Sequence, residues 1–284
     1  IRHQVRAPTP HGVTVSDALD RIAEHLRSLI VTATALGLDV AAVCVAVPGI
    51  VDDARGVARH AANLGWRDVP VAQDLSSRLD REVIVTHDVR AGGLAESRAG
   101  ASAGVRDSLF VAVGTGVSAA LIVDGSPVLA GGHAGEIGHL KVRGAVTACV
   151  CGDTGCLETV ASASAIARSY GELGGTQVVG AVQVADRVRA GDPLAEAVWA
   201  RAIDALGDVL APCAAVLGSQ VVVVGGGLAR AGQLLLEPLT DRITANTGAG
   251  ARPPPRVVAA ALGDAAGCLG AAMLAWTAVD RGVR

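Results

Sequence analysis

Residues 136–158 read EIGHLKVRGAVTACVCGDTGCLE, a stretch dense in potential metal ligands. One histidine and three cysteines fall within eighteen positions: His139, Cys149, Cys151 and Cys156. A tetrahedral structural zinc site uses four such ligands and leaves no open position for water. Gly152 and Gly155 suit the tight backbone that wraps ligands around an ion. The stretch therefore predicts a structural zinc loop.

Other interpretations of these cysteines explain the pattern less well. Two cysteines in a Cys-x-Cys pair lie too close for the separation and bond vectors that a disulfide needs. Cys44, Cys213 and Cys268 are scattered singly in apolar surroundings, as small core residues are. His133 is an alternative to His139 as the histidine ligand. Thiols kept as metal ligands also favour a reducing compartment.

The composition is that of a protein with a substantial apolar core. The 284 residues are 51% hydrophobic and carry a net charge of −3, which suffices for one large or two medium domains. This slightly acidic balance, with Lys141 as the only lysine, argues against a nucleic-acid-binding surface in this segment. No apolar run reaches the roughly 18–20 residues of a membrane span, and the first residues lack the pattern of a secretory leader. We therefore expect a cytoplasmic protein.

Strand-like and helix-like segments alternate along the chain. Strands are expected at residues 41–47, 83–86, 108–113, 117–123, 220–224 and 256–260. Helical periodicity is expected after Ser16, at 91–99, over 158–217 with two breaks, and at 263–279. This alternation is typical of α/β layers with buried strands, and Asp124-Gly125 predicts a hairpin turn. Ile1–Pro10 resembles a short strand from the middle of a fold, so we expect a further segment before Ile1.

Asp88 is the main candidate for a catalytic group. It stands just after the strand expected at 83–86 and before a helix. A carboxylate at the carboxyl end of a strand points into the crevice where α/β proteins bind ligands. There it can take a proton from an attacking hydroxyl. The alternative is that Asp88 caps the following helix.

Two glycine turns are candidate phosphate sites. Gly114-Thr115-Gly116 lies between two expected strands and offers backbone N–H groups and a hydroxyl. An ordinary tight hairpin is the alternative. Gly225-Gly226-Gly227 follows an apolar strand and precedes a helix, which suits a nucleotide. The full dinucleotide fingerprint is absent, which disfavours a dinucleotide enzyme. Asn63 lies in a polar turn before Trp66, and is either a ligand contact or part of a loop that the tryptophan anchors.

In this order, these residues resemble the ROK family of repressors and sugar kinases. The resemblance covers nearly the whole chain and is most specific in residues 136–158. It implies an α/β protein with the two-domain, actin-like (ribonuclease-H-like, hexokinase-type) fold and an interdomain cleft. We expect an N-terminal domain at 1–106 and a C-terminal domain at 107–284, whose last helix packs back on the first domain. The family resemblance also suggests a homodimer or homotetramer.

The resemblance implies roles for single residues. Zinc would be held by His139, Cys149, Cys151 and Cys156. The sugar hydroxyls would be contacted by Asn63, Glu136, His139 and Glu158. Asp88 matches the family's catalytic base. Gly114-Thr115-Gly116 resembles the second phosphate loop, and Gly225–Gly227 the turn on the adenosine side.

The sequence departs from the family pattern in two places. The Asp-x-Gly-Gly-Thr phosphate loop of the family's kinases does not occur here, and we expect it in a segment before Ile1. His87 stands where these kinases usually have an asparagine before the catalytic aspartate. A neutral imidazole has one donor and one acceptor, so His87 can still bond to a sugar hydroxyl. The substitution leaves the choice of hexose open.

These features predict an ATP-dependent hexose kinase. Asp88 would deprotonate the attacking hydroxyl, magnesium would neutralise charge on the transferred phosphoryl group, and positioning would supply most of the rate. The alternative is the effector domain of a sugar-sensing repressor, which would bind DNA only through a helix-turn-helix before residue 1. Asp88 and the intact Gly114-Thr115-Gly116 turn favour the kinase. A sugar-binding protein without catalysis is a third interpretation, because of His87.

Overall fold

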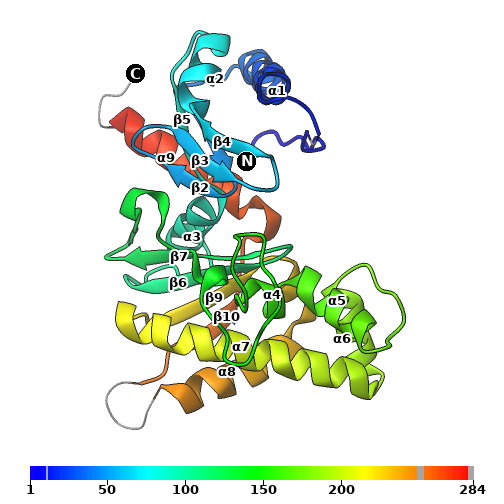
Figure 1. Cartoon of the computed structure of the whole chain (residues 1–284). Coiled ribbons are helices and arrows are strands. Elements are labelled where there is room, and N and C mark those ends of the chain that lie inside the picture. Colours follow the sequence, from blue (N-terminus) through cyan, green and yellow to red (C-terminus); the bar gives the residue numbers. More distant parts are fainter. Residues whose placement is uncertain (11, 248–252, 281–284) are drawn as a thin grey trace. The chain divides into compact units, whose positions relative to one another are not determined.

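The computed structural model describes residues 1–10, 12–247 and 253–280 (Figure 1). The chain divides into two compact units. The first comprises Ile1–Ala91, Leu129–His133 and the chain from Gly267 on, and the second comprises Gly92–Val128 and Ala134–Ala266. The domain boundary expected between residues 106 and 107 stays a prediction. Among the described helices, none is both long enough and apolar enough to span a membrane.

The first unit contains two small sheets. Its strands are β1 (Val43–Val47), β2 (Ile50–Asp52), β3 (Val57–Ala61), β4 (Trp66–Val69) and β5 (Val83–His87). β1 and β5 pair in parallel, whereas β2, β3 and β4 form an antiparallel meander. Its helical elements are α1 (Val15–Ala35), α2 (Val71–Leu79), η1 (Ala130–Gly132) and most of α9 (Ala266–Asp280). Leu19, Leu75 and Trp66 are buried in its core.

The second unit is built on one five-stranded sheet with the order β10-β9-β6-β7-β8. The strands are β6 (Ser108–Val113), β7 (Val117–Val123), β8 (Ser126–Pro127), β9 (Val221–Gly225) and β10 (Arg256–Ala259). The helices are α4 (Glu158–Ala161), α5 (Ala163–Glu172), α6 (Ala181–Arg189), α7 (Pro193–Leu217) and α8 (Gln233–Asn246). Three short 3₁₀ helices are η2 (Ile137–His139), η3 (Gly227–Ala231) and η4 (Gly263–Ala265). Helix α3 (Asp88–Ala99) begins in the first unit and continues in the second.

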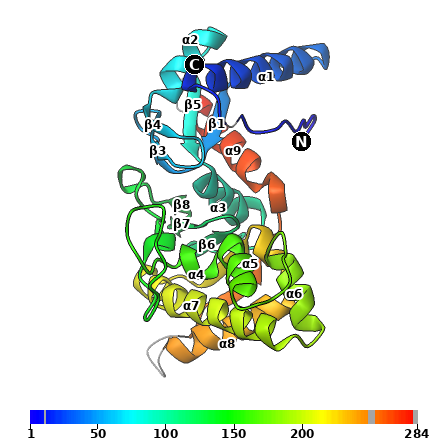
Figure 2. The same ribbon diagram turned by 45° about the vertical axis from the view of Figure 1, so that its right-hand side comes forward.

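Helices cover both faces of this sheet. Figures 1 and 2 show α7 and α8 on one face and α3 on the other. Helix α3 approaches closely at Gly93, where a Cβ atom would lie 2.4 Å from the Cβ of Ala120. The four valines of β9 are fully buried, as expected for a strand covered on both faces.

The parallel pairing of β6 with β9 places the candidate phosphate turns. Ala112 near the end of β6 lies opposite Gly225 at the end of β9. Because parallel strands end at the same edge of a sheet, Gly114–Gly116 and Gly225–Gly227 both lie at that edge. The pairing therefore brings two turns that are more than a hundred residues apart in the sequence to the same edge of the sheet.

Several local predictions hold, and others need correction. The strands at 108–113 and 117–123 are confirmed, and the Asp124-Gly125 turn has both φ angles positive, at 54° and 72°. Ile1–Pro10 was expected to form a strand, but these residues have no regular secondary structure and pair with no described strand. Helix α1, expected after Ser16, begins at Val15, and its N-cap is Thr14, whose hydroxyl accepts from the backbone N–H of Asp17.

Candidate functional site

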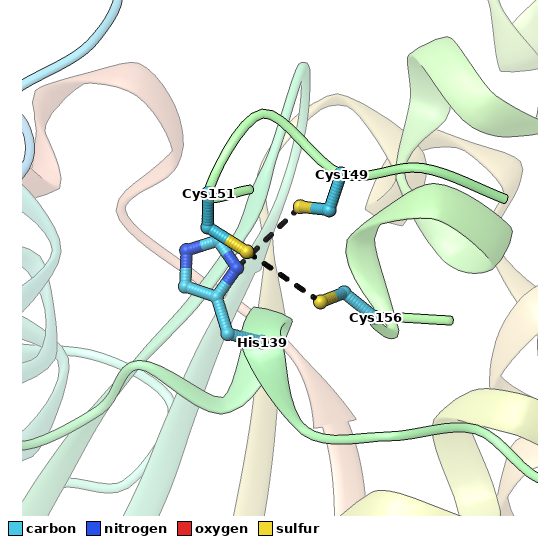
Figure 3. A group of neighbouring side chains, drawn as sticks. All are labelled: His139, Cys149, Cys151 and Cys156. Carbon is cyan, nitrogen blue, oxygen red and sulfur yellow. Dashed lines mark hydrogen bonds between the residues drawn. The ribbon is translucent and has the colours of Figure 1, made fainter. Parts of the chain in front are cut away.

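The predicted metal ligands come together in the second unit. His139 ends η2, Cys149 and Cys151 flank a turn, and Cys156 precedes α4. Their ligand atoms all lie within 4.8 Å of one another. Figure 3 shows the four side chains pointing toward a common centre. His133 is not among them.

The spacing of these atoms fits a tetrahedral ion. The Sγ of Cys149 lies 3.7 Å from Nδ1 of His139, and the Sγ atoms of Cys151 and Cys156 are also 3.7 Å apart. Metal–sulfur bonds of about 2.3 Å and metal–nitrogen bonds of about 2.0 Å give tetrahedral edges of about 3.5–3.8 Å. Burial raises the pKa of the Cys156 thiol to about 12 without a metal, so an ion has to displace its proton. The donor set and its spacing therefore suit zinc.

The backbone around the cluster is tightly built. The Cys149 N–H donates to the carbonyl of Asp153 at 2.7 Å. Gly155 has a φ of 71° and approaches Ala145 so closely that a Cβ atom would lie 2.5 Å from its carbonyl oxygen. A side chain at position 155 would disturb the loop, which accounts for the glycine.

The segment that carries Glu136 and His139 packs against the first residues of β7. The Ala119 N–H donates to the Gly135 carbonyl at 2.8 Å. At Gly138 a Cβ atom would lie 2.1 Å from the carbonyl oxygen of Val117. His139 turns Nε2 away from the cysteines, and this atom lies 3.8 Å from Oε2 of Glu136. The two predicted sugar contacts are thus neighbours.

Glu158 contacts the first residue of the same strand. Its Oε2 accepts a hydrogen bond from the backbone N–H of Val117 at 3.0 Å. The Ala163 N–H donates to the carbonyl of Gly114 at 2.8 Å. A Cβ atom at Gly226 would lie 2.4 Å from the carbonyl oxygen of Val113. Glu158 and both glycine turns therefore lie together in the second unit, with Thr115 exposed.

The remaining candidates belong to the first unit. Asp88 follows β5 directly, and its side chain is 44% exposed. Its Oδ1 accepts from the Val89 N–H at 2.7 Å, so Asp88 is an N-terminal helix residue that also stays accessible. Asn63 is exposed in the turn between β3 and β4, beside the buried Trp66.

A buried ionic network that the sequence pattern does not indicate lies beside Asp88. Arg90 is 1% exposed and donates to Oδ2 of Asp53 at 2.5 Å and to the carbonyl of Val51 at 2.8 Å. The Thr86 hydroxyl donates to the other oxygen of Asp53 at 2.6 Å. Arg90 lies two residues after Asp88, so the network fixes the start of α3.

His87 is buried next to this network. Its ring is in contact with Asp88, with Nε2 3.2 Å from Oδ1. Burial, followed by the positive charge of Arg90, lowers the pKa of His87 to about 3. The imidazole is therefore neutral at physiological pH.

This pKa has a consequence for stability. The unfolded chain binds a proton at His87 near pH 6.5, whereas the folded chain does not until about pH 3. Neutral His87 therefore contributes to the free energy of unfolding above pH 6.5, and this contribution is lost as the pH falls toward 3. From pH 7 to pH 5 we expect wild type to lose about 2 kcal/mol more free energy of unfolding than His87→Gln. Urea titrations at both values measure this difference, with the exposed His60→Gln as control; equal losses in wild type and His87→Gln would contradict it.

Comparison with known proteins identifies the family. The ROK family model matches residues 1–278. The chain belongs to the ROK family. It is 35% identical to a glucokinase of Halalkalibacterium halodurans over 250 residues, which cover 81% of this chain and 72% of that protein.

Solved ROK structures share its fold. A ROK hexokinase from Thermus thermophilus is 31% identical with a TM-score of 0.81, covering 97% of this chain and 91% of that one. A ROK glucokinase from Streptomyces griseus, solved with glucose and AMPPNP, is 30% identical with a TM-score of 0.80, covering 95% and 90%. The expected actin-like α/β fold is thereby confirmed.

Proposed function

We propose that this chain is an ATP-dependent sugar kinase with a hexose as acceptor. The observation that carries the proposal is the gathering of Glu136, His139 and Glu158 around the first residues of β7, next to two glycine turns. Sugar-binding groups and phosphate-binding turns are the two parts that such a reaction needs. The similarity to glucokinases, one of them solved with glucose and AMPPNP, supports this function.

Asp88 is the general base of the proposed reaction. Its carboxylate takes the proton of the attacking sugar hydroxyl as the oxygen bonds to the γ-phosphorus and the bond from that phosphorus to the bridging oxygen of ADP breaks. The bond from Val89 to Oδ1 and the Arg90 network hold the start of α3, which fixes the orientation of the carboxylate. We assign the sugar hydroxyls to a set of polar side chains: Asn63, His87, Glu136, His139 and Glu158.

The proposed ATP site consists mainly of backbone groups. Gly114-Thr115-Gly116 offers N–H groups and the exposed Thr115 hydroxyl to phosphate oxygens, and Gly225–Gly227 lies beside it on the same sheet edge. Magnesium, when bound with ATP, neutralises charge on the transferred phosphoryl group. Zinc in the His139 cluster is structural, since four protein ligands leave no position for a substrate. A cytoplasmic homodimer or homotetramer completes the proposal.

A repressor effector domain is the second candidate. The chain is 28% identical to the DNA-binding transcriptional repressor Mlc of Escherichia coli over 235 residues, covering 79% of this chain and 58% of that protein. A sugar-sensing domain would use the same sugar contacts without phosphoryl transfer. The exposed Asp88 carboxylate favours the kinase.

A panel of hexoses separates the two functions. The gene product that contains this chain is mixed with ATP, magnesium and each sugar, and ADP release is followed beside sugar binding by calorimetry. The kinase proposal expects at least one hexose that both binds and stimulates ADP release. Binding without any sugar-dependent ADP release would favour the repressor.

A further inference from the structure

Glu158 has a role in the structure that sugar binding alone does not explain. Its Oε2 accepts from the backbone N–H of Val117, the residue that follows the Gly114–Gly116 turn. In the described chain, no hydrogen bond to its other oxygen, Oε1, is seen. One carboxylate oxygen therefore holds the turn, and the second is available to a ligand.

Gly116 is a glycine because of this carboxylate. A Cβ atom at position 116 would lie 2.4 Å from Oε2 of Glu158. Gly116 does not have a positive φ angle, so a left-handed backbone is not the reason for this glycine. By contrast, a Cβ atom at Gly114 would meet no atom within 4 Å. The Glu158 carboxylate thus occupies the space that a side chain at position 116 would need, whereas a side chain at position 114 would meet no such neighbour.

Glu158 is also tied to the metal loop. It lies two residues after the ligand Cys156, which forms an isolated β-bridge with Lys141. The intervening Leu157 is fully buried, and its N–H donates to the carbonyl of Leu140 at 2.8 Å. Leu140 itself follows the ligand His139. A metal that draws His139 and Cys156 together would thus fix the backbone just before Glu158 and the neighbouring segment to which it is hydrogen-bonded.

We propose that Glu158 is a positioning residue that transmits the order of the metal loop to the Gly114–Gly116 turn. Metal binding would fix the position of Cys156 and, through the backbone, that of Glu158. The Glu158 carboxylate accepts from the Val117 N–H and so restrains the turn that precedes Val117. The consequence for phosphate binding rests on the proposed kinase function, whereas the consequence for the Val117 hydrogen bond does not. Metal removal should therefore loosen a turn whose residues are not ligands.

Amide hydrogen exchange at Val117 tests this in the zinc-loaded gene product. Glu158→Ala should raise the exchange rate at least about 10-fold, since it removes a hydrogen bond to a charged acceptor. Glu158→Gln keeps an oxygen acceptor and should stay within about 3-fold of wild type. Gly116→Ala should match Glu158→Ala, and the double variant should show no further increase, because both changes break one contact. Gly114→Ala is the matched control and should leave exchange at Val117 unchanged.

A second hydrogen-exchange experiment removes the metal. EDTA should raise exchange at Val117 in wild type but not in Glu158→Ala, in which the link is already broken. An equal rise in both proteins would overturn the proposed route. Unchanged exchange at Val117 in both Glu158→Ala and Gly116→Ala would overturn the positioning role itself.

Measurements of AMPPNP and hexose affinity test whether the Gly114–Gly116 turn takes part in nucleotide binding. Magnesium–AMPPNP should bind about 10-fold more weakly to Glu158→Ala and nearly normally to Glu158→Gln. A loss of hexose affinity with unchanged AMPPNP affinity and unchanged exchange would leave Glu158 as a sugar ligand alone and overturn the inference. If wild type does not bind AMPPNP while the exchange results hold, the kinase proposal fails and the positioning role stands.

Discussion

Asp88→Asn is expected to lower the turnover of the gene product that contains this chain by at least about 100-fold, the usual scale of a general base. The amide cannot accept the proton of the attacking hydroxyl, but its shape preserves the start of α3. The Val89 N–H can still donate to the amide oxygen in place of Oδ1. Sugar affinity should therefore change by less than about 3-fold, because only the transition state loses an interaction.

Steady-state kinetics and calorimetry on the same preparation separate these quantities. Asp80→Asn is the matched control, because Asp80 is also in the first unit, is exposed, and ends α2 with a φ of 48° that asparagine tolerates. Near-normal turnover in Asp88→Asn would remove Asp88 from the mechanism. A large loss of sugar affinity with normal turnover at saturation would instead make it a substrate ligand.

Removing the metal should have the second large effect. We expect about one zinc per chain, with metal–sulfur distances near 2.3 Å by X-ray absorption. His139 offers Nδ1 to the cluster while Nε2 faces Glu136, so a bound ion would orient a ring that we propose also contacts the sugar. Chelation should lower hexose affinity at least about 10-fold before the protein unfolds globally.

Two measurements check this coupling. Calorimetry compares the hexose affinity of zinc-loaded and metal-free protein, while circular dichroism confirms that the metal-free protein stays folded. Cys151→Ser should reproduce the loss by weakening the site. Cys268 was expected in the core, but it is exposed and lies outside the cluster, so Cys268→Ser should leave hexose affinity unchanged. Equal hexose affinity with and without metal would mean that zinc stabilises the loop but does not affect the sugar site. If protein purified without chelator holds no zinc, the predicted zinc site is wrong.

The sequence predicted best what depends on neighbours along the chain. The metal cluster lies within eighteen positions, so spacing alone brought His139, Cys149, Cys151 and Cys156 into one hypothesis, and the structure groups them. The β6 and β7 strands and the Asp124-Gly125 turn were predicted for the same reason. These features need only local periodicity and turn chemistry.

Features that depend on distant parts of the chain were missed. Nothing in the sequence around Arg90 indicates that it is buried against Asp53, because their pairing requires β2 to lie beside β5. The β2–β4 meander also escaped prediction, since β3 contains the polar pair Arg59-His60 rather than a continuous apolar run. The bond from Val117 to Glu158 joins residues 41 positions apart. Contacts of this kind follow from packing, which periodicity does not reveal.

We propose that the chain transfers the γ-phosphoryl group of ATP to a sugar hydroxyl. The most direct measurement is ³¹P nuclear magnetic resonance of the gene product with ATP, magnesium and a hexose that it binds, recorded beside Asp88→Asn. We expect a sugar phosphate ester to appear in equal amount to ADP in wild type, and at least about 100-fold more slowly in the variant. ATP that stays intact while the hexose binds with measurable affinity would contradict the claim.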